Sequence, residues 1–182
     1  AATYQLAGAL IDLTPLLESP TWGLSSEEQK DFFPAFLRQD LSPLFRHARL
    51  GLAPNRSTEV LYYNREWLRE LGLNAPPANP DEFKAVACMA ARTPFSKSTA
   101  AGGGMGYAFD FDASRLASWI FAMGGDIFDE QKVAYTYDSA VAQETLTYLR
   151  DLFKAGCAAA VSERFGDQTD FGAGRLLFTT AS

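Results

Sequence analysis

Two aspartates, Asp110 and Asp112, come nearest to a catalytic pair in this sequence by residue type and spacing. They lie two residues apart on a segment expected to be a strand, so both carboxylates would point to one face. Such a pair could act as general acid and base or hold a cation. Carboxylates at strand ends more often hydrogen-bond a polar ligand or cap the next helix, which makes catalysis the less favoured interpretation.

Two further motifs with possible chemistry have plainer interpretations. Residues 102–106, GGGMG, resemble a phosphate-cradling loop. Such loops lead into a helix N-terminus, whereas a strand is expected to follow here, so a flexible loop is favoured. The single His47 lies in a basic loop segment without a GxSxG elbow, which favours a solvated or structural histidine. No catalytic residue, metal or cofactor is predicted.

The two cysteines and Trp119 are also expected to be structural. Cys88 lies on a predicted helix face, and Cys157 follows a helix-ending glycine. Two free, largely buried thiols are favoured, with a disulfide as the alternative for an exported protein. Trp119 shares a helical stripe with Leu116 and Met123, so we expect it in the core rather than stacked on a ligand.

Composition describes an ordinary folded chain. Of 182 residues, 47% are apolar and 21% charged, and 16 basic against 22 acidic residues give a net charge of −6. This chain length suits one domain or a piece of a larger protein. An acidic chain without a long Lys/Arg run argues against nucleic acid and anionic membranes as partners. Residues 1–17 read as the middle of a domain and carry no signal-peptide pattern, so we expect a piece of a longer protein.

The elements that must position these residues follow from caps and periodicity. Ser25 and Glu28 are spaced as a capping box, and Pro34 is expected to end or kink that helix. Loops are expected over 40–57 and 93–106. The predicted strands are 59–63 (buried), 106–111, 132–137 and 175–180. The predicted helices are 65–71, 80–92, one carrying Leu116 to Met123, and 139–155. Strands that alternate with helices predict an α/β fold.

Several short motifs also follow one another in a recognisable order. They are Gly8–Pro15, Glu59–Asn64, Pro80–Phe83, Gly124-Gly125-x-x-Phe128 and Phe171–Arg175. In this order they resemble the extracellular solute-binding proteins of ABC importers, in the sugar-binding family that includes maltose-binding and glycerol-phosphate-binding proteins. Within that family, Asn55–Thr58, Gly106–Ala108 and Thr179–Ser182 look most like the glycerol-phosphate-binding branch.

The resemblance implies an α/β fold of the periplasmic-binding-protein type II kind, with a ligand cleft between two lobes. Residues 1–58 would be the tail end of the first lobe and the approach to the hinge. Residues 59–182 would be most of the second lobe, itself incomplete. The full-length protein would be periplasmic or extracellular and associated with the membrane through its transporter. It would capture a carbohydrate or a glycerol-phosphate-like solute and dock on an ABC permease.

The resemblance also implies ligand contacts, which we carry over residue by residue. Asp112 would accept hydrogen bonds from hydroxyls, Arg115 would donate to hydroxyls or phosphate, and Phe111 would stack on a sugar face. Asp112 and Arg115 are expected on a strand-to-helix loop, where replacement should cost little packing. The full set of implied contacts is Ser57, Phe111, Asp112, Ser114, Arg115 and Ser182. Relatives often carry Trp or Tyr in 111–115, where this chain has one Phe.

Two rival functions remain open at this point. One is a carboxylate-based glycoside hydrolase that uses Asp110 or Asp112, and the other is a structural or interaction module that binds no solute. We also expect the isolated chain to self-associate. Residues 1–20 are apolar, and the strand 175–180 lies at the end of the sequence, where an unpaired edge invites another chain.

Overall fold

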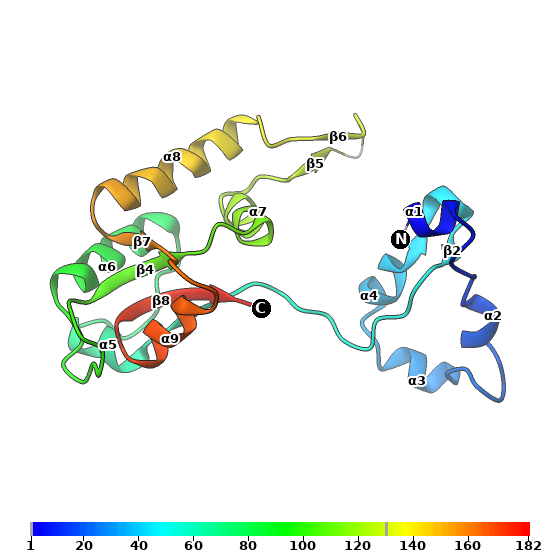
Figure 1. Cartoon of the computed structure of the whole chain (residues 1–182), viewed down its shortest axis with the longest axis horizontal. Coiled ribbons are helices and arrows are strands. Elements are labelled where there is room, and N and C mark those ends of the chain that lie inside the picture. The colour runs from blue at the N-terminus through cyan, green and yellow to red at the C-terminus, as the bar shows by residue number, and fades with distance from the viewer. Residues whose placement is uncertain (1, 130) are drawn as a thin grey trace. The chain divides into compact units, whose positions relative to one another are not determined.

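The computed structural model describes residues 2–129 and 131–182. The chain divides between Ser57 and Thr58 into two compact units (Figure 1). None of the described helices is long and apolar enough to cross a membrane.

The first unit consists of short elements. The helices are α1 (Ala2–Leu6), α2 (Thr14–Leu17), α3 (Ser26–Lys30), α4 (Pro34–Gln39) and the 3-10 helix η1 (Pro43–Phe45), and β1 (Leu41–Ser42) pairs with β2 (Ala48–Arg49). The capping box is confirmed, because Ser25 accepts from the Glu28 amide and Glu28 accepts from the Ser25 amide. Pro34 begins a new helix rather than kinking the old one. The predicted loop 40–57 therefore contains a small hairpin.

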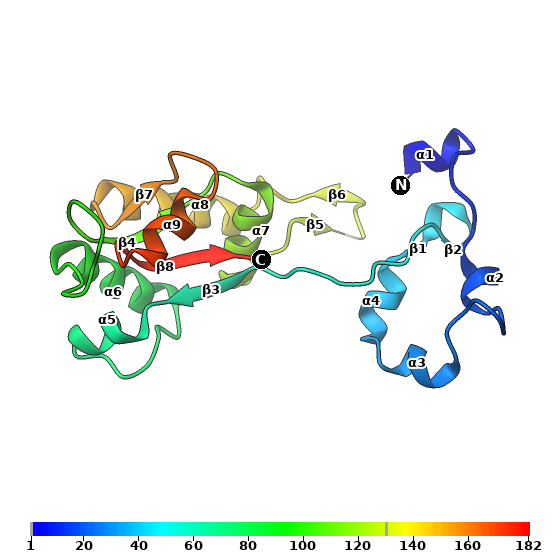
Figure 2. The ribbon, with the colours of Figure 1, turned by 60° about the horizontal axis from the view of Figure 1, so that its bottom comes forward.

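The second unit is built on a sheet in the order β3-β8-β4-β7 (Figure 2). β4 runs parallel to β7 and β8, and β3 runs antiparallel to β8. Its strands are β3 (Val60–Tyr63), β4 (Met105–Phe109), β7 (Ala158–Ala160) and β8 (Leu176–Ala181), with a separate hairpin of β5 (Phe128–Asp129) and β6 (Ala134–Tyr135). Its helices are α5 (Arg65–Glu70), α6 (Pro80–Arg92), α7 (Ala113–Ala122), α8 (Ala140–Lys154) and α9 (Gly166–Gly172). The predicted α/β fold is confirmed.

Local sequence signals fix where the helices of this unit begin. The side chains of Asn64, Asn79 and Ser139 each accept a hydrogen bond from a backbone amide in the first turn of α5, α6 and α8, as N-caps do. On α6 the predicted i, i+3, i+4, i+7 stripe is the buried face: Phe83, Val86, Ala87 and Ala90.

The two faces of β8 meet different helices. Phe178 stacks on Phe83 of α6 with ring centroids 4.7 Å apart. Thr179, the next residue, points the other way and its hydroxyl donates to Asp167 of α9 over 2.8 Å. Gly106 lets α6 approach β4, because a Cβ there would lie 2.1 Å from the carbonyl oxygen of Ala87. Helices therefore cover both faces of the sheet.

The structure corrects several predictions about strands. β3 is at the edge of the sheet, and its four residues are 37% to 47% exposed rather than buried. Apolar composition alone does not distinguish an edge strand from a central one. β4 ends at Phe109, so Asp110 and Asp112 lie beyond the strand and do not share its face. The short strand β7 and helix α9 were not predicted; α9 follows Phe165 at φ 63° without a side-chain cap.

The prediction of two free thiols is wrong, since Cys88 and Cys157 form a disulfide. The bond joins α6 to the residue before β7 across 69 positions of sequence. The described part of the chain holds no free cysteine. Periodicity within each helix could not reveal this pairing, because it depends on α6 packing beside β7.

We expect the disulfide to stabilise the second unit by shrinking the unfolded ensemble. A loop of this length corresponds to about 4 kcal/mol in the chain-entropy model. Urea unfolding of the protein with and without reductant should show this loss. The Cys88→Ala/Cys157→Ala double variant should unfold at the lower free energy and be insensitive to reductant. Equal unfolding midpoints with and without reductant in the unmodified chain would contradict the expectation.

Candidate functional site

The polar residues of the second unit gather at one edge of the sheet. Because β4 and β8 are parallel, their carboxyl ends lie at the same edge. β3 is antiparallel to β8 and enters there, with Val60 opposite Ala181. The segment after β4, the last residue of the chain and the residue before β3 therefore meet. Carboxyl ends of strands are where open α/β sheets bind ligands.

A buried ion pair forms the base of this edge. Arg115, in the first turn of α7, is 8% exposed, and its Nη1 lies 3.2 Å from Asp167 Oδ2 and 3.5 Å from Asp110 Oδ2. Asp167 is 2% exposed and accepts a second hydrogen bond from the Thr179 hydroxyl. The expectation that Arg115 lies on a strand-to-helix loop, where its replacement costs little packing, is wrong, because Arg115 is in α7 and its guanidinium is buried and paired.

Asp112 is the N-cap of α7, which is the role that the sequence analysis favoured over catalysis. Its Oδ1 accepts from the Ser114 amide over 2.8 Å and lies 2.5 Å from the Ser114 hydroxyl oxygen. These hydrogen bonds lower the pKa of the Asp112 carboxyl. The same Ser114 Oγ lies 2.8 Å from Glu59 Oε1. The buried Oε2 of Glu59 has no hydrogen-bond partner.

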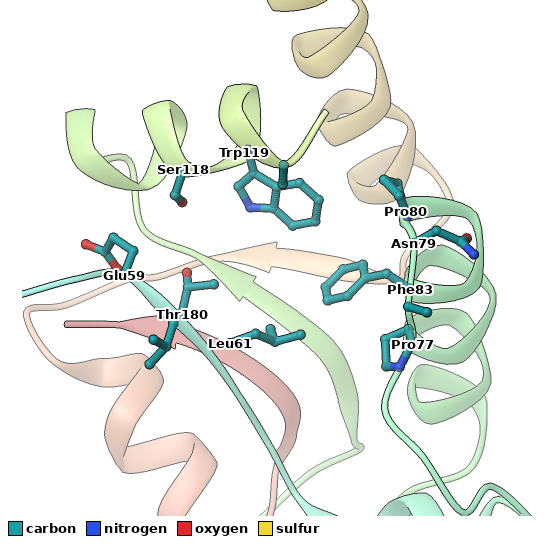
Figure 3. A pocket seen from close by; sticks show the side chains of 12 residues that line it. Glu59, Leu61, Pro77, Asn79, Pro80, Phe83, Ser118, Trp119 and Thr180 are labelled. Atoms are coloured by element: carbon teal, nitrogen blue, oxygen red, sulfur yellow. The ribbon is translucent and has the colours of Figure 1, made fainter. Parts of the chain in front are cut away.

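A cavity of about 270 Å³ opens beside Glu59 (Figure 3). One side of it is aromatic: Trp119 and Phe83 meet edge to face with centroids 5.1 Å apart. The Trp119 Nε1 donates to the Tyr107 hydroxyl over 3.1 Å, and that hydroxyl is 3.0 Å from Thr180 Oγ1. Burial raises the pKa of the Tyr107 phenol, so it keeps its proton. The cavity is lined by residues 59–61, 77–80, Phe83, Ser118, Trp119, Ala122 and Thr180.

The structure brings some of the predicted site residues together and separates others. Asp112, Ser114 and Arg115 lie in one cluster with Glu59. Phe111 is 76% exposed and stacks on Phe153 of α8, with centroids 6.1 Å apart. Phe111 lines a different hollow, between α7 and α8, and Asp112 lines it too. None of the six predicted contacts lines the cavity beside Glu59.

The other two predicted contacts, Ser57 and Ser182, are exposed. Ser182 is exposed at the end of β8. Ser57 is the last residue of the first unit. Trp119 is buried, as predicted, but it also forms a wall of the cavity.

Sequence reasoning missed Glu59, Asp167 and Thr180. Glu59 had one available signal, an acidic residue directly before an apolar strand. Asp167 had none, because α9 itself was not predicted. His47 is exposed, as expected. In the described residues no group of three or more His, Cys, Asp or Glu side chains could hold a metal ion.

Three comparisons place this geometry among known proteins. The profile of a family described as "Bacterial extracellular solute-binding protein" matches residues 1–178. A search of curated proteins found no match to the sequence. Among solved structures, the GacH receptor of Streptomyces glaucescens, studied unliganded and with acarbose, is similar with a TM-score of 0.76 and 19% identity over 98% of this chain and 42% of that one.

Two other structures show the same fold. The ABC substrate-binding protein Lmo0181 from Listeria monocytogenes, in complex with cycloalternan, gives a TM-score of 0.67 at 22% identity over 98% of this chain and 44% of that chain. Maltose-bound MalE3 of T. maritima gives a TM-score of 0.65 at 19% identity, over 98% of this chain and 48% of that chain. The present chain thus spans less than half the length of each of these proteins.

The ion pair at the base of the site should be essential for stability. Removing one partner of a buried pair leaves an uncompensated charge, which destabilises a protein by about 3–5 kcal/mol. We expect a loss of this size for Asp167→Ala in chemical denaturation. Asp170→Ala, on the same helix, removes a partly exposed pair with Arg175. This control should lose at most about 1 kcal/mol. Similar losses in the two variants would mean that the Arg115–Asp167 pair has no special role.

Proposed function

Because the chain belongs to the family of bacterial extracellular solute-binding proteins, we propose that the full-length protein captures a carbohydrate and delivers it to an ABC permease. The family that the sequence motifs indicated is thereby confirmed, and the carbohydrate and the permease are our proposal. The observation that carries it is the cavity beside Glu59, which combines an aromatic wall with polar groups at a sheet edge. Carbohydrates present apolar C–H faces and hydroxyls, and ligand sites usually combine apolar walls with a few polar groups.

The charges at this edge favour a neutral carbohydrate over a glycerol-phosphate-like solute. The side chains of Glu59, Asp110, Asp112 and Asp167 are carboxylates, and Arg115 is the cation among them. Its guanidinium already faces two carboxylates. A phosphate would meet net negative charge there and find the guanidinium occupied. A hydroxyl, in contrast, donates to a carboxylate without charge repulsion. The names of the similar structures, which mention acarbose, cycloalternan and maltose, point the same way.

As part of the proposal, the six predicted contacts would touch the solute from outside the cavity beside Glu59, since none of them lines it. Asp112 and Ser114 would bind solute hydroxyls at the start of α7, and Arg115 would hold that end of the helix in place while offering its remaining N–H groups. Phe111 and Ser182 would contact solute from the loops after β4 and β8. Ser57 would contact it from the approach to the hinge.

The proposed mechanism is capture without turnover. Residues 1–58 would be the end of the first lobe and the hinge approach, and 59–182 would be most of the second lobe. The lobes would close on the solute about hinge strands, and the closed form would dock on the permease. The full-length protein would then act in the periplasm or outside the cell, associated with the membrane through its transporter.

Hydrolysis is the less favoured alternative. A glycoside hydrolase needs one carboxylic acid with a raised pKa to protonate the leaving group. The pKa of Asp112 is instead lowered by Ser114, and Asp110 lies against a buried guanidinium. The lowered pKa of Asp112 is the opposite of what a general acid needs. The other alternative, a structural module that binds no solute, would show no thermal stabilisation by any solute.

We expect thermal unfolding of the full-length protein to shift upward with a neutral carbohydrate. A panel of maltose, acarbose, cycloalternan and glycerol 3-phosphate tests this, and saturation at 100-fold the Kd adds about 2.7 kcal/mol to the free energy of unfolding. The carbohydrate that binds should be recovered unchanged. Release of a smaller sugar would support the hydrolase, a response to glycerol 3-phosphate alone would overturn the preference for neutral solutes, and no response would support the structural module.

We also propose that the isolated 182-residue chain self-associates. Tyr4, Leu6 and Ile11 in the first unit are 66%, 80% and 67% exposed. Exposed apolar patches of this kind usually mark interfaces. Light scattering at tens of micromolar should report a mass above that of one chain, and replacing these three residues by serine should lower it. A clean monomer of the unmodified chain would refute this.

A further inference from the structure

Glu59 is a carboxylate that the fold leaves incompletely satisfied. It precedes β3, and its Oε2 is buried without a hydrogen-bond partner. Most buried polar side-chain atoms in proteins have a partner, because an unpaired one loses its hydration without compensation. A carboxylate oxygen is an acceptor only. The group it lacks is therefore a donor.

The neighbouring side chains do not supply that donor. Ser114 Oγ is within hydrogen-bond distance of both Glu59 Oε1 and Asp112 Oδ1, but a hydroxyl carries one proton and can donate to only one of them at a time. The Ser118 hydroxyl, at the same side of the cavity, already donates to the Arg115 carbonyl over 2.8 Å. The Arg115 guanidinium faces Asp110 and Asp167. The start of α7 thus has more acceptors than donors.

Glu59 also lines the cavity, although its Oε2 is itself buried. Glu59 lines the cavity together with Thr180 and Trp119, and Figure 3 shows its carboxylate on the same side as Ser118. The terminal torsion of a glutamate is soft, so Oε2 can turn toward the cavity without movement of β3. Trp119 and Phe83 supply aromatic surface to the same cavity.

We propose that Glu59 anchors the solute, with its carboxylate accepting a hydrogen bond from a hydroxyl of a sugar ring held between it and Trp119. This inference rests on the proposed carbohydrate function and adds a specificity determinant to it. The solute must bring a donor to this position. A sugar whose hydroxyl here is methylated would bind poorly, since it would leave the carboxylate unpaired.

The test compares Glu59→Gln with Glu66→Gln in the full-length protein. Glutamine keeps the size of the side chain but replaces one acceptor oxygen by an NH₂ donor. Glu66, on α5, forms an exposed pair with Lys97 and serves as the control. Calorimetric titration with maltose and with acarbose should show a Kd about tenfold to hundredfold higher for Glu59→Gln, the loss expected for a hydrogen bond to a charged group. The control should match the unmodified protein.

The ligand-free melting temperature separates anchoring from a structural role. Glu59→Gln removes an unpaired buried acceptor, so its melting temperature should stay the same or rise while affinity falls. A lower melting temperature with unchanged affinity would make Glu59 a structural partner of Ser114 and overturn the inference. Glu59→Asp, which keeps the charge but withdraws it from the cavity, should also weaken binding if anchoring is correct.

The two proposals fail in different ways. If the unmodified protein binds neither maltose nor acarbose, nor any other carbohydrate of the panel above, the carbohydrate function fails and the inference fails with it. If a carbohydrate binds equally well to the unmodified protein and to Glu59→Gln, the function stands and Glu59 is not its anchor.

Discussion

The ion pair between Arg115 and Asp167 is the interaction on which the site depends. Arg115 lies in the first turn of α7, on one face of the sheet, and Asp167 lies in the first turn of α9, on the other. Their side chains meet at the edge where β4 and β8 end, and Thr179 of β8 adds a third contact. The pair therefore holds helices from both faces against the carboxyl ends of two parallel strands.

The fixed position of α7 determines what the cavity beside it presents. The first turn of that helix brings the Ser114 hydroxyl to Glu59, and its second turn brings the indole of Trp119 to Phe83 and Tyr107. Charge is concentrated at one end and aromatic surface at the other. Because the Arg115 guanidinium is already paired with Asp110 and Asp167, it is not free to pair with Glu59, and the Oε2 acceptor of Glu59 has no hydrogen-bond partner. A neutral solute rich in hydroxyls complements this arrangement better than an anion does.

A second constraint, a disulfide, fixes a helix to the same sheet. The disulfide between Cys88 and Cys157 links α6 to the start of β7. α6 also packs closely on β4 through Gly106. The aromatic wall of the cavity begins on α6 at Phe83, so its position depends on this packing. Such a bond persists in oxidising surroundings, which agrees with a family of extracellular proteins.

The sequence by itself determined the features that depend on near neighbours. Asn64, Asn79 and Ser139 begin helices because each side chain reaches an amide two or three residues ahead, and the buried stripe of α6 follows from its periodicity. The order of these motifs also indicated the family. Only the tertiary structure decided that Cys88 meets Cys157, that Arg115 is buried on Asp167 and that Ser114 reaches Oε1 of Glu59 while Oε2 has no partner. These contacts join residues more than 50 positions apart. They depend on the order and direction of the strands, which no local pattern records.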